Sequence, residues 1–125
     1  MPAPKIPAVQ LAIRFGLEIG ALVALGRWAA TLVAGPWSYA AAFGAPAVAA
    51  TLWVTFAVRD DPSRSGRAPV PVPGLARLAL ELAVFLGGAA ALGARGSWIA
   101  FGVFVSALVV HHAMTRARLR WLLQQ

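Results

Sequence analysis

The stretch LAIRFGLEIGALVALG, residues 11–26, is apolar throughout except for Arg14 and Glu18 near one end. A second stretch, LARLALELAVFLGGAAALG at residues 75–93, repeats this pattern with Arg77 and Glu81. Residues four apart lie on the same face of an α-helix. The two stretches therefore predict two apolar helices, each with one Arg and one Glu on a single face.

The composition of the whole chain indicates a membrane protein. Of its 125 residues, 60% are hydrophobic and 12% are charged, and the mean hydropathy is +0.74. Soluble domains have about 45–50% apolar and about 25% charged residues. A soluble fold of this size leaves much of its surface in water, so the surplus apolar side chains should face lipid or a partner. The chain contains no cysteine, which excludes disulfides and thiolate metal sites.

The pattern of apolar segments predicts an all-α fold in one domain, residues 1–125. Each segment has roughly 20 residues or more, enough to cross a hydrocarbon core of ~30 Å. Runs of Ala and Leu without period-two alternation favour helices over strands. Short breaks pair the segments into two helical hairpins, joined by the Pro-rich loop 59–74. The four predicted transmembrane helices cover residues 8–33, 37–58, 75–94 and 97–120.

The basic residues predict that both termini lie in the cytoplasm. In that orientation nine of the eleven basic residues lie on the cytoplasmic side, and only Arg27 and Arg95 lie outside. This topology explains the net charge of +7 better than nucleic-acid binding, because the charges flank apolar segments. Ten of these residues are Arg, which is typical of a GC-rich bacterial genome. We therefore expect a multi-pass protein of the bacterial cytoplasmic (inner) membrane.

The first apolar segment is expected to be retained in the protein. It is too long for a cleaved signal peptide and contains Glu18.

The shared Arg-x-x-Leu-Glu pattern indicates an internal repeat. The chain would then be two copies of one hairpin pointing the same way, with a pseudo-twofold axis along the membrane normal. Such a parallel repeat differs from the inverted repeats of many transporters. Chance similarity between two Ala- and Leu-rich segments is the alternative.

The segments LAIRFGLEIGALVALGRW, WVTFAVRDDPSRSGRAPVPVPG and RLALELAVFLGGAAAL resemble the YrdB family of small bacterial four-helix membrane proteins. The resemblance covers most of residues 10–115. The family is one of unknown function, so the resemblance implies a fold and a location but no activity.

The four intramembrane charges are expected to pair across the repeat. An unpaired charge in the middle of a spanning helix costs roughly 2.5–3.5 kcal/mol, so both Glu side chains should face the bundle interior. If the first and third helices pack together, Glu18 can meet Arg77 while Glu81 meets Arg14. The favoured interpretation is a structural lock. The alternative is an ion or small-molecule transporter or channel that uses Glu18 and Glu81, since intramembrane acids often mark pathways.

Several other residues are predicted to support the bundle. His111 and His112 lie at about the depth of the charges, as hydrogen-bonding neighbours or, alternatively, as a pH sensor. Adjacent histidines without a nearby Cys or Asp hold a metal poorly, so no metal site is expected. Two ridges of small residues predict close helix packing, within the chain or with another subunit: Gly16 with Gly20, and Gly102 with Ser106.

The end of the chain and the central loop are assigned to the membrane surface. Arg116, Arg118 and Arg120 should extend the last helix beyond the bilayer edge and contact anionic lipid headgroups. Asp60 and Asp61 are interpreted as a solvated turn.

The chain contains no phosphate-binding glycine loop and no Ser/His/Asp set with catalytic spacing. We therefore expect a non-enzymatic structural or accessory protein with no cofactor. Its partners would be the lipid bilayer and either further copies of the chain or a larger membrane protein, and no nucleic acid.

Overall fold

The computed structural model describes residues 2–64 and 66–125. Apart from loops, this part of the chain consists of helices and one short two-stranded sheet, which confirms the predicted all-α class. Its elements are α1 (Ala8–Ala30), α2 (Trp37–Thr55), β1 (Phe56–Ala57), β2 (Val70–Pro71), α3 (Gly74–Ala94), α4 (Trp98–Met114) and α5 (Arg116–Leu122).

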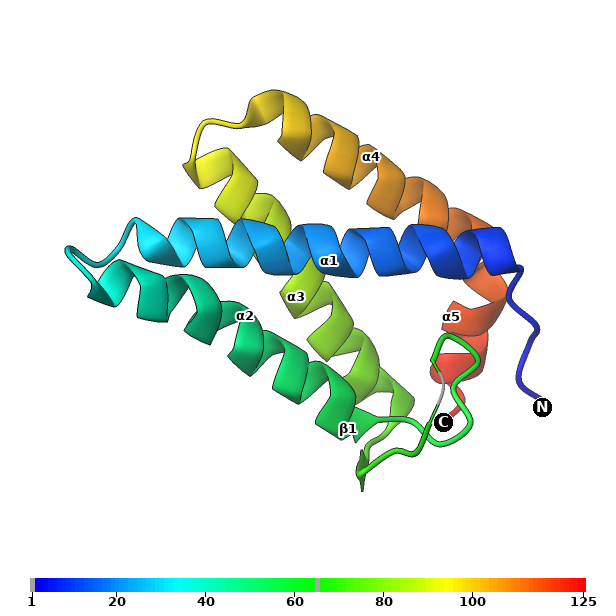
Figure 1. The fold of residues 1–125 in the computed structure, drawn as a ribbon. Coiled ribbons are helices and arrows are strands. Elements are labelled where there is room, and N and C mark those ends of the chain that lie inside the picture. The colour runs from blue at the N-terminus through cyan, green and yellow to red at the C-terminus, as the bar shows by residue number, and fades with distance from the viewer. Residues whose placement is uncertain (1, 65) are drawn as a thin grey trace.

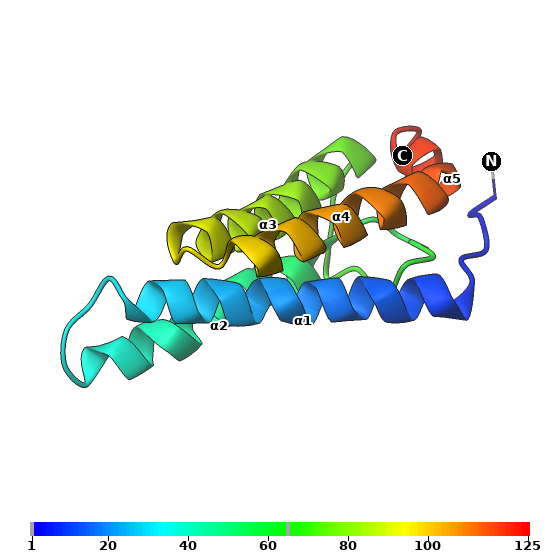
Figure 2. The same ribbon diagram turned by 90° about the horizontal axis from the view of Figure 1, so that it is seen from above.

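The four long helices form two hairpins that pack as two layers (Figures 1 and 2). One layer holds α1 and α2, and the other holds α3 and α4. α1 and α3 are the central helices, because each of them contacts the three other long helices. α1 and α3 run in the same direction, so the Arg-Glu pairs of both helices lie at the same end of the bundle. The apolar core between the layers consists of Leu17, Ala21, Val84, Phe85, Ala89, Phe104 and Leu108.

Close helix contacts occur at glycines other than the predicted ones. A Cβ at Gly88 would lie 2.8 Å from the Cα of Ala21, and a Cβ at Gly26 would clash with the carbonyl oxygen of Ala42. These two glycines therefore let α1 approach α3 and α2, as small residues do at membrane helix contacts.

The predicted small-residue ridges are largely unused within the single chain. Gly20 packs against the ring of Phe104, which is 3.6 Å from its Cβ position, but Gly16, Gly102 and Ser106 are exposed. Helical spacing gives the reason. Gly102 and Ser106 lie on the face of α4 opposite its buried Phe104, and Gly16 lies outside the buried face of α1.

The predicted single helix over residues 97–120 is wrong. α4 ends at Met114, and α5 turns away from it by 71° at Thr115. The hydroxyl of Thr115 donates to the carbonyl oxygen of His111 at 2.8 Å. The turn brings α5 back under the bundle, where the carbonyl of Leu122 lies directly against Gly74 at the start of α3.

Two helices, α1 and α3, are long and apolar enough to cross a membrane, and the bent pair of α4 and α5 qualifies if it counts as one span. α2 has a similar length, but its Trp-Ser-Tyr start and Pro46 lower its mean hydropathy, so α2 is not among these candidate spans. α1 and α2 are also shorter at their C-terminal ends than the sequence predicts.

The chain after α2 leaves the helix to form the short sheet. β1 pairs in parallel with β2, with Phe56 opposite Val70, and the amide of Val72 donates to the carbonyl of Ala57 at 2.9 Å. Part of the predicted Pro-rich loop is therefore a strand at a sheet edge, where proline is tolerated. The pairing of the two strands holds the ends of the intervening loop, at Val58 and Pro69, close together.

The contact between α1 and α3 can be tested with two neighbouring glycines. Gly88→Ala should lower the free energy of unfolding by about 1–3 kcal/mol, because the new methyl group overpacks against Ala21. Gly87→Ala is the matched control, since its Cβ position is 3.7 Å from the Leu25 side chain and the helix gains from alanine. Thermal unfolding in detergent would measure both. Equal stability of the two variants would contradict the observed packing.

Candidate functional site: a buried network of arginines and carboxylates

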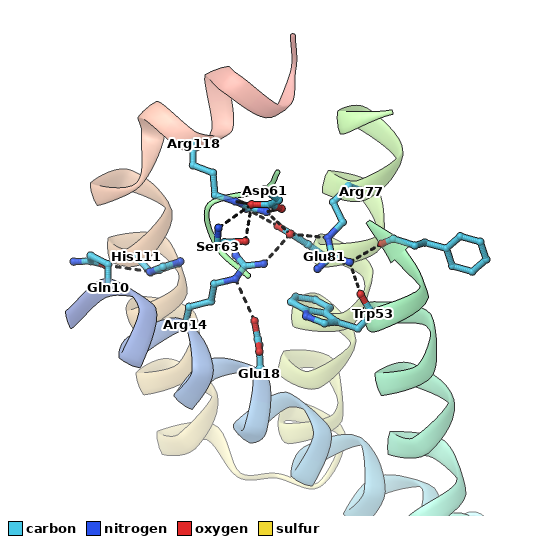
Figure 3. A network of polar contacts seen from close by, with 11 residues as sticks. Gln10, Arg14, Glu18, Trp53, Asp61, Ser63, Arg77, Glu81, His111 and Arg118 are labelled. Atoms are coloured by element: carbon cyan, nitrogen blue, oxygen red, sulfur yellow. Dashed lines mark hydrogen bonds and ion pairs between the residues drawn. The ribbon is translucent and has the colours of Figure 1, made fainter. Parts of the chain in front are cut away.

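The carboxylate of Glu81, on α3, is the centre of a buried polar network (Figure 3). Its side chain is fully buried. Arg14 Nη2 donates to Oε1 at 2.7 Å, and Arg77 Nε donates to the same oxygen at 3.0 Å. Arg118 reaches both oxygens, at 2.7 Å from Nη2 to Oε1 and 3.0 Å from Nη1 to Oε2. Three arginines from α1, α3 and α5 therefore meet at one carboxylate.

Arg77 also secures the end of α2. Its Nη1 donates to the carbonyl oxygens of Trp53, at 2.5 Å, and Phe56, at 2.7 Å. The last carbonyls of a helix have no partner within the helix, so this guanidinium caps α2. The Arg77 guanidinium also lies over the Trp53 ring, 4.6 Å from its centroid, a distance at which the cation and the ring attract each other.

Arg118 ties the central loop to the network. Its Nε and Nη2 donate to the two oxygens of Asp61 at 2.9 and 2.5 Å. The amide and hydroxyl of Ser63 donate to Asp61 Oδ1 at 2.9 and 2.8 Å. Burial by itself would raise the pKa of Asp61, but the hydrogen bonds from Arg118 and Ser63 outweigh it and hold that pKa below its usual value. The loop carboxylate is therefore a buried anion, not a solvated turn residue.

Glu18 occupies the edge of the network. Arg14 Nε lies 3.1 Å from Glu18 Oε1, and the Glu18 side chain keeps 25% of its surface exposed. The predicted pair of Glu18 with Arg77 is not formed in the described structure. Arg77 directs Nε to Glu81 and Nη1 to the carbonyls at the end of α2, and its buried Nη2 has no partner in the described structure. The predicted symmetric cluster of four charges is therefore replaced by an asymmetric network.

The network is formally neutral, with three arginines and three carboxylates. Arg14, Arg77 and Arg118 balance Glu18, Glu81 and Asp61, which are three of the four acidic residues in the chain. Reasoning from sequence missed Arg118 and Asp61. The scarcity of acids was the available signal, because each buried Arg needs a carboxylate partner.

The three arginines near the end of the chain, Arg116, Arg118 and Arg120, differ in their exposure. Arg118 is 2% exposed and therefore cannot contact lipid headgroups, contrary to the prediction. Arg116 and Arg120 are exposed and remain available for such contacts. The bend at Thr115 separates them, because it directs Arg118 back toward Asp61 and Glu81.

The two histidines lie beside the network and do not bond to its acids. His111 is buried, and its Nδ1 lies 3.1 Å from Gln10 Oε1. His112 Nδ1 donates to the carbonyl of Leu108 at 2.8 Å. Across residues 2–64 and 66–125, no three His, Asp or Glu side chains are grouped as metal ligands would be.

Glu18 faces a hollow surface between α1 and α2. Two adjoining cavities, of about 480 and 180 Å³, share Phe15, Glu18, Trp53 and Val54 among their lining residues. We call the two cavities together the α1–α2 groove. Glu81 lines neither cavity, so of the two predicted glutamates only Glu18 can be reached from the groove.

The ion pair of Asp61 in the central loop with Arg118 in α5 predicts that the stability of the protein depends on pH. The pKa of Asp61 is lower in the folded protein than in the unfolded chain, where it is about 3.9. The ionised side chain therefore contributes fully to the free energy of unfolding above about pH 3.9, and this contribution is lost as the pH falls through the pKa of the folded protein. Asp61→Asn should lower the free energy of unfolding by roughly 1–3 kcal/mol at neutral pH. The difference from the unmodified protein should shrink below about pH 4.

Chemical unfolding in detergent across this pH range would measure the effect. Asp60→Asn is the matched control, because Asp60 is exposed and its φ of 59° suits asparagine. A difference for Asp61→Asn that stayed constant down to pH 3 would contradict the assignment of a buried anion.

Comparisons with known proteins identify the family of the chain. Residues 12–115 match the model of a family described as "Protein of unknown function (DUF2568)". The chain is also 36% identical over 121 residues to "Uncharacterized protein YrdB" of Bacillus subtilis (strain 168), covering 97% of this chain and 98% of the relative. No solved structure matches the chain significantly. The resemblance seen in the repeated Arg-x-x-Leu-Glu segments is thus confirmed over nearly the full length: the chain is a relative of YrdB and belongs to the DUF2568 family.

Proposed function

We propose that the protein is a non-enzymatic structural or accessory protein of the bacterial cytoplasmic membrane. In this proposal all four long helices cross the bilayer, and the buried network locks the two hairpins and the central loop into one arrangement. The observation that carries it is the coordination of Glu81 by three arginines from three helices.

The exposed surfaces of α2 and α4 support four crossings. At about 28 and 26 Å, their lengths approach the hydrocarbon thickness of ~30 Å. No residue of α2 is buried within the chain, and large exposed apolar surfaces are rare on soluble proteins. The large side chains that these two helices expose are Trp37, Tyr39, Phe43, Val48, Leu52, Val54, Trp98, Ile99, Val103, Val109, Val110 and Met114.

The distribution of charge supports cytoplasmic termini. The central loop, α5 and both ends of the described chain lie at one end of the bundle (Figure 1), together with most of the basic residues. Arg27 and Arg95 lie at the other end, where Arg95 Nη1 donates to the carbonyl of Arg27 at 2.9 Å. An excess of Arg on one side marks the cytoplasmic side.

The state of Glu81 favours a lock over transport at this residue. A carboxylate offers about four lone-pair sites for hydrogen bonds, and Glu81 accepts four from guanidinium groups. Three of these hydrogen bonds end on Oε1 and one ends on Oε2, so a cation at this carboxylate would meet the positive charges of three guanidinium groups. The same crowding leaves no room for a substrate, since Glu81 lines neither cavity of the α1–α2 groove.

The internal repeat is part of the proposal. Parallel α1 and α3 carry Arg-x-x-Leu-Glu at the same end of the bundle, as duplication of one hairpin would produce. The two copies would then have diverged, because Glu81 binds three arginines and Glu18 binds one.

The lock predicts unequal effects of two equivalent substitutions. Glu81→Gln should lower the free energy of unfolding by about 3–5 kcal/mol, because it leaves buried guanidinium charges without compensation. Glu18→Gln should cost less than about 1 kcal/mol, since Glu18 is partly exposed and has one ion pair. Unfolding of the purified full chain in detergent would measure both. The lock would be refuted if Glu81→Gln were no more damaging than Glu18→Gln.

A second candidate function is transport of an ion or small molecule through Glu18 alone. The partly exposed position of Glu18 in the α1–α2 groove favours it. In that case Glu18→Gln would abolish proton or cation flux in proteoliposomes while leaving the unfolding curve nearly unchanged. Flux equal to that of protein-free liposomes, for both the unmodified chain and Glu18→Gln, would exclude this alternative for the ions tested.

A further inference from the structure

The α1–α2 groove has the length of one membrane leaflet. It runs along α1 from Leu11 to Leu22, a rise of about 16 Å, against ~30 Å for the whole hydrocarbon core. Its deeper part is lined mostly by apolar side chains. They are Phe15, Ile19, Leu22, Ala49, Ala50, Trp53, Val54 and Val84, with Glu18 the one charged lining residue there.

The mouth of the groove is basic. The central loop contributes Pro62, Ser63 and Arg64 to the wider cavity of about 480 Å³. Arg64 Nη2 makes one long hydrogen bond, 3.4 Å, to the carbonyl of Val54. Arg64 Nη1 is buried without a hydrogen-bond partner in the described structure. A buried donor without a partner carries a desolvation cost that an acceptor in the groove would remove.

The charges that line the groove leave one positive charge. Arg14 and Arg64 contribute two positive charges, and Glu18 contributes one negative charge. Glu18 is matched by Arg14 at 3.1 Å, so the excess resides on Arg64. A phosphodiester carries a single negative charge, and its oxygens suit the donors of a guanidinium group.

We propose that the α1–α2 groove binds an anionic phospholipid of the cytoplasmic leaflet. One acyl chain lies between α1 and α2, against Phe15, Trp53 and Ala50, and the phosphate accepts hydrogen bonds from Arg64 at the mouth. The site rests on the membrane orientation in the proposed function, but not on the strength of the lock at Glu81.

The position of Trp53 in the groove allows a direct test. The purified full chain in detergent is titrated with phosphatidylglycerol that carries brominated acyl chains, which quench a nearby indole. We expect saturable quenching, and its largest component should disappear in Trp53→Phe. Phosphatidylcholine with the same brominated chains should bind about tenfold more weakly, because its headgroup has no net negative charge.

Two pairs of variants separate the headgroup site from the acyl-chain site. Arg64→Gln should weaken phosphatidylglycerol binding about tenfold and phosphatidylcholine binding by less, because the choline cation already offsets the charge of the phosphate. Arg67→Gln, the same charge change at an exposed position of the same loop, should leave both unchanged. Ala50→Leu should fill the groove and weaken both lipids. Ala47→Leu, at an exposed position outside the groove, should weaken neither.

Each contrary result overturns the proposal. Equal binding of the two lipids, with no effect of Arg64→Gln, would show an apolar site without headgroup recognition. Absence of Trp53 quenching would show that no acyl chain enters the groove. Dimerisation that Ala50→Leu abolishes, with no lipid quenching, would identify a second copy as the occupant. Failure of the lock would appear separately, in the unfolding of Glu81→Gln without added lipid.

Discussion

The burial of one carboxylate organises this protein. Glu81 is inaccessible to water, and an ionised carboxylate in such a place needs charged donors around it. Those donors come from α1, α3 and α5, and each brings a further segment with it. Arg77 holds the carbonyl end of α2, and Arg118 holds the central loop through Asp61. The relative positions of both hairpins, the bent last helix and the loop therefore depend on the charge of one side chain.

The benefit of this network lies more in specificity than in net stability. Desolvation of buried ion pairs offsets much of their attraction. Apolar helices in lipid, however, gain no hydrophobic energy from one particular partner, since lipid tails are as apolar as leucine. Such helices need packing and polar contacts to fix their register. Gly88 provides close packing against Ala21, and the guanidinium-carboxylate contacts provide the polar part, because a shift of one turn would strand buried charges.

The sequence predicted those parts of the fold that local patterns determine. Apolar length located α1 to α3 within a few residues at each boundary, and the Arg-x-x-Leu-Glu spacing placed Arg14 near Glu81. The contacts of Arg118 had no such signal, because Asp61 is 57 positions away along the chain. A basic residue just beyond an apolar segment also has the usual appearance of a headgroup contact. The bend at Thr115 follows from these distant pairs, so helical periodicity could not reveal it.

Glu18 and Glu81, the two glutamates of the apparent repeat, lie in different environments, and Arg14 contacts both of them. Its Nη2 lies 2.7 Å from Glu81 and its Nε lies 3.1 Å from Glu18. Glu81 lies in the interior and Glu18 lines the α1–α2 groove, so one guanidinium joins the buried network to the groove. A molecule that enters the groove and attracts Arg14 must compete with Glu81 for it. Occupation of the groove would then act on the helix contacts through a single side chain, which is a direct route from the surrounding lipid to the packing of the bundle.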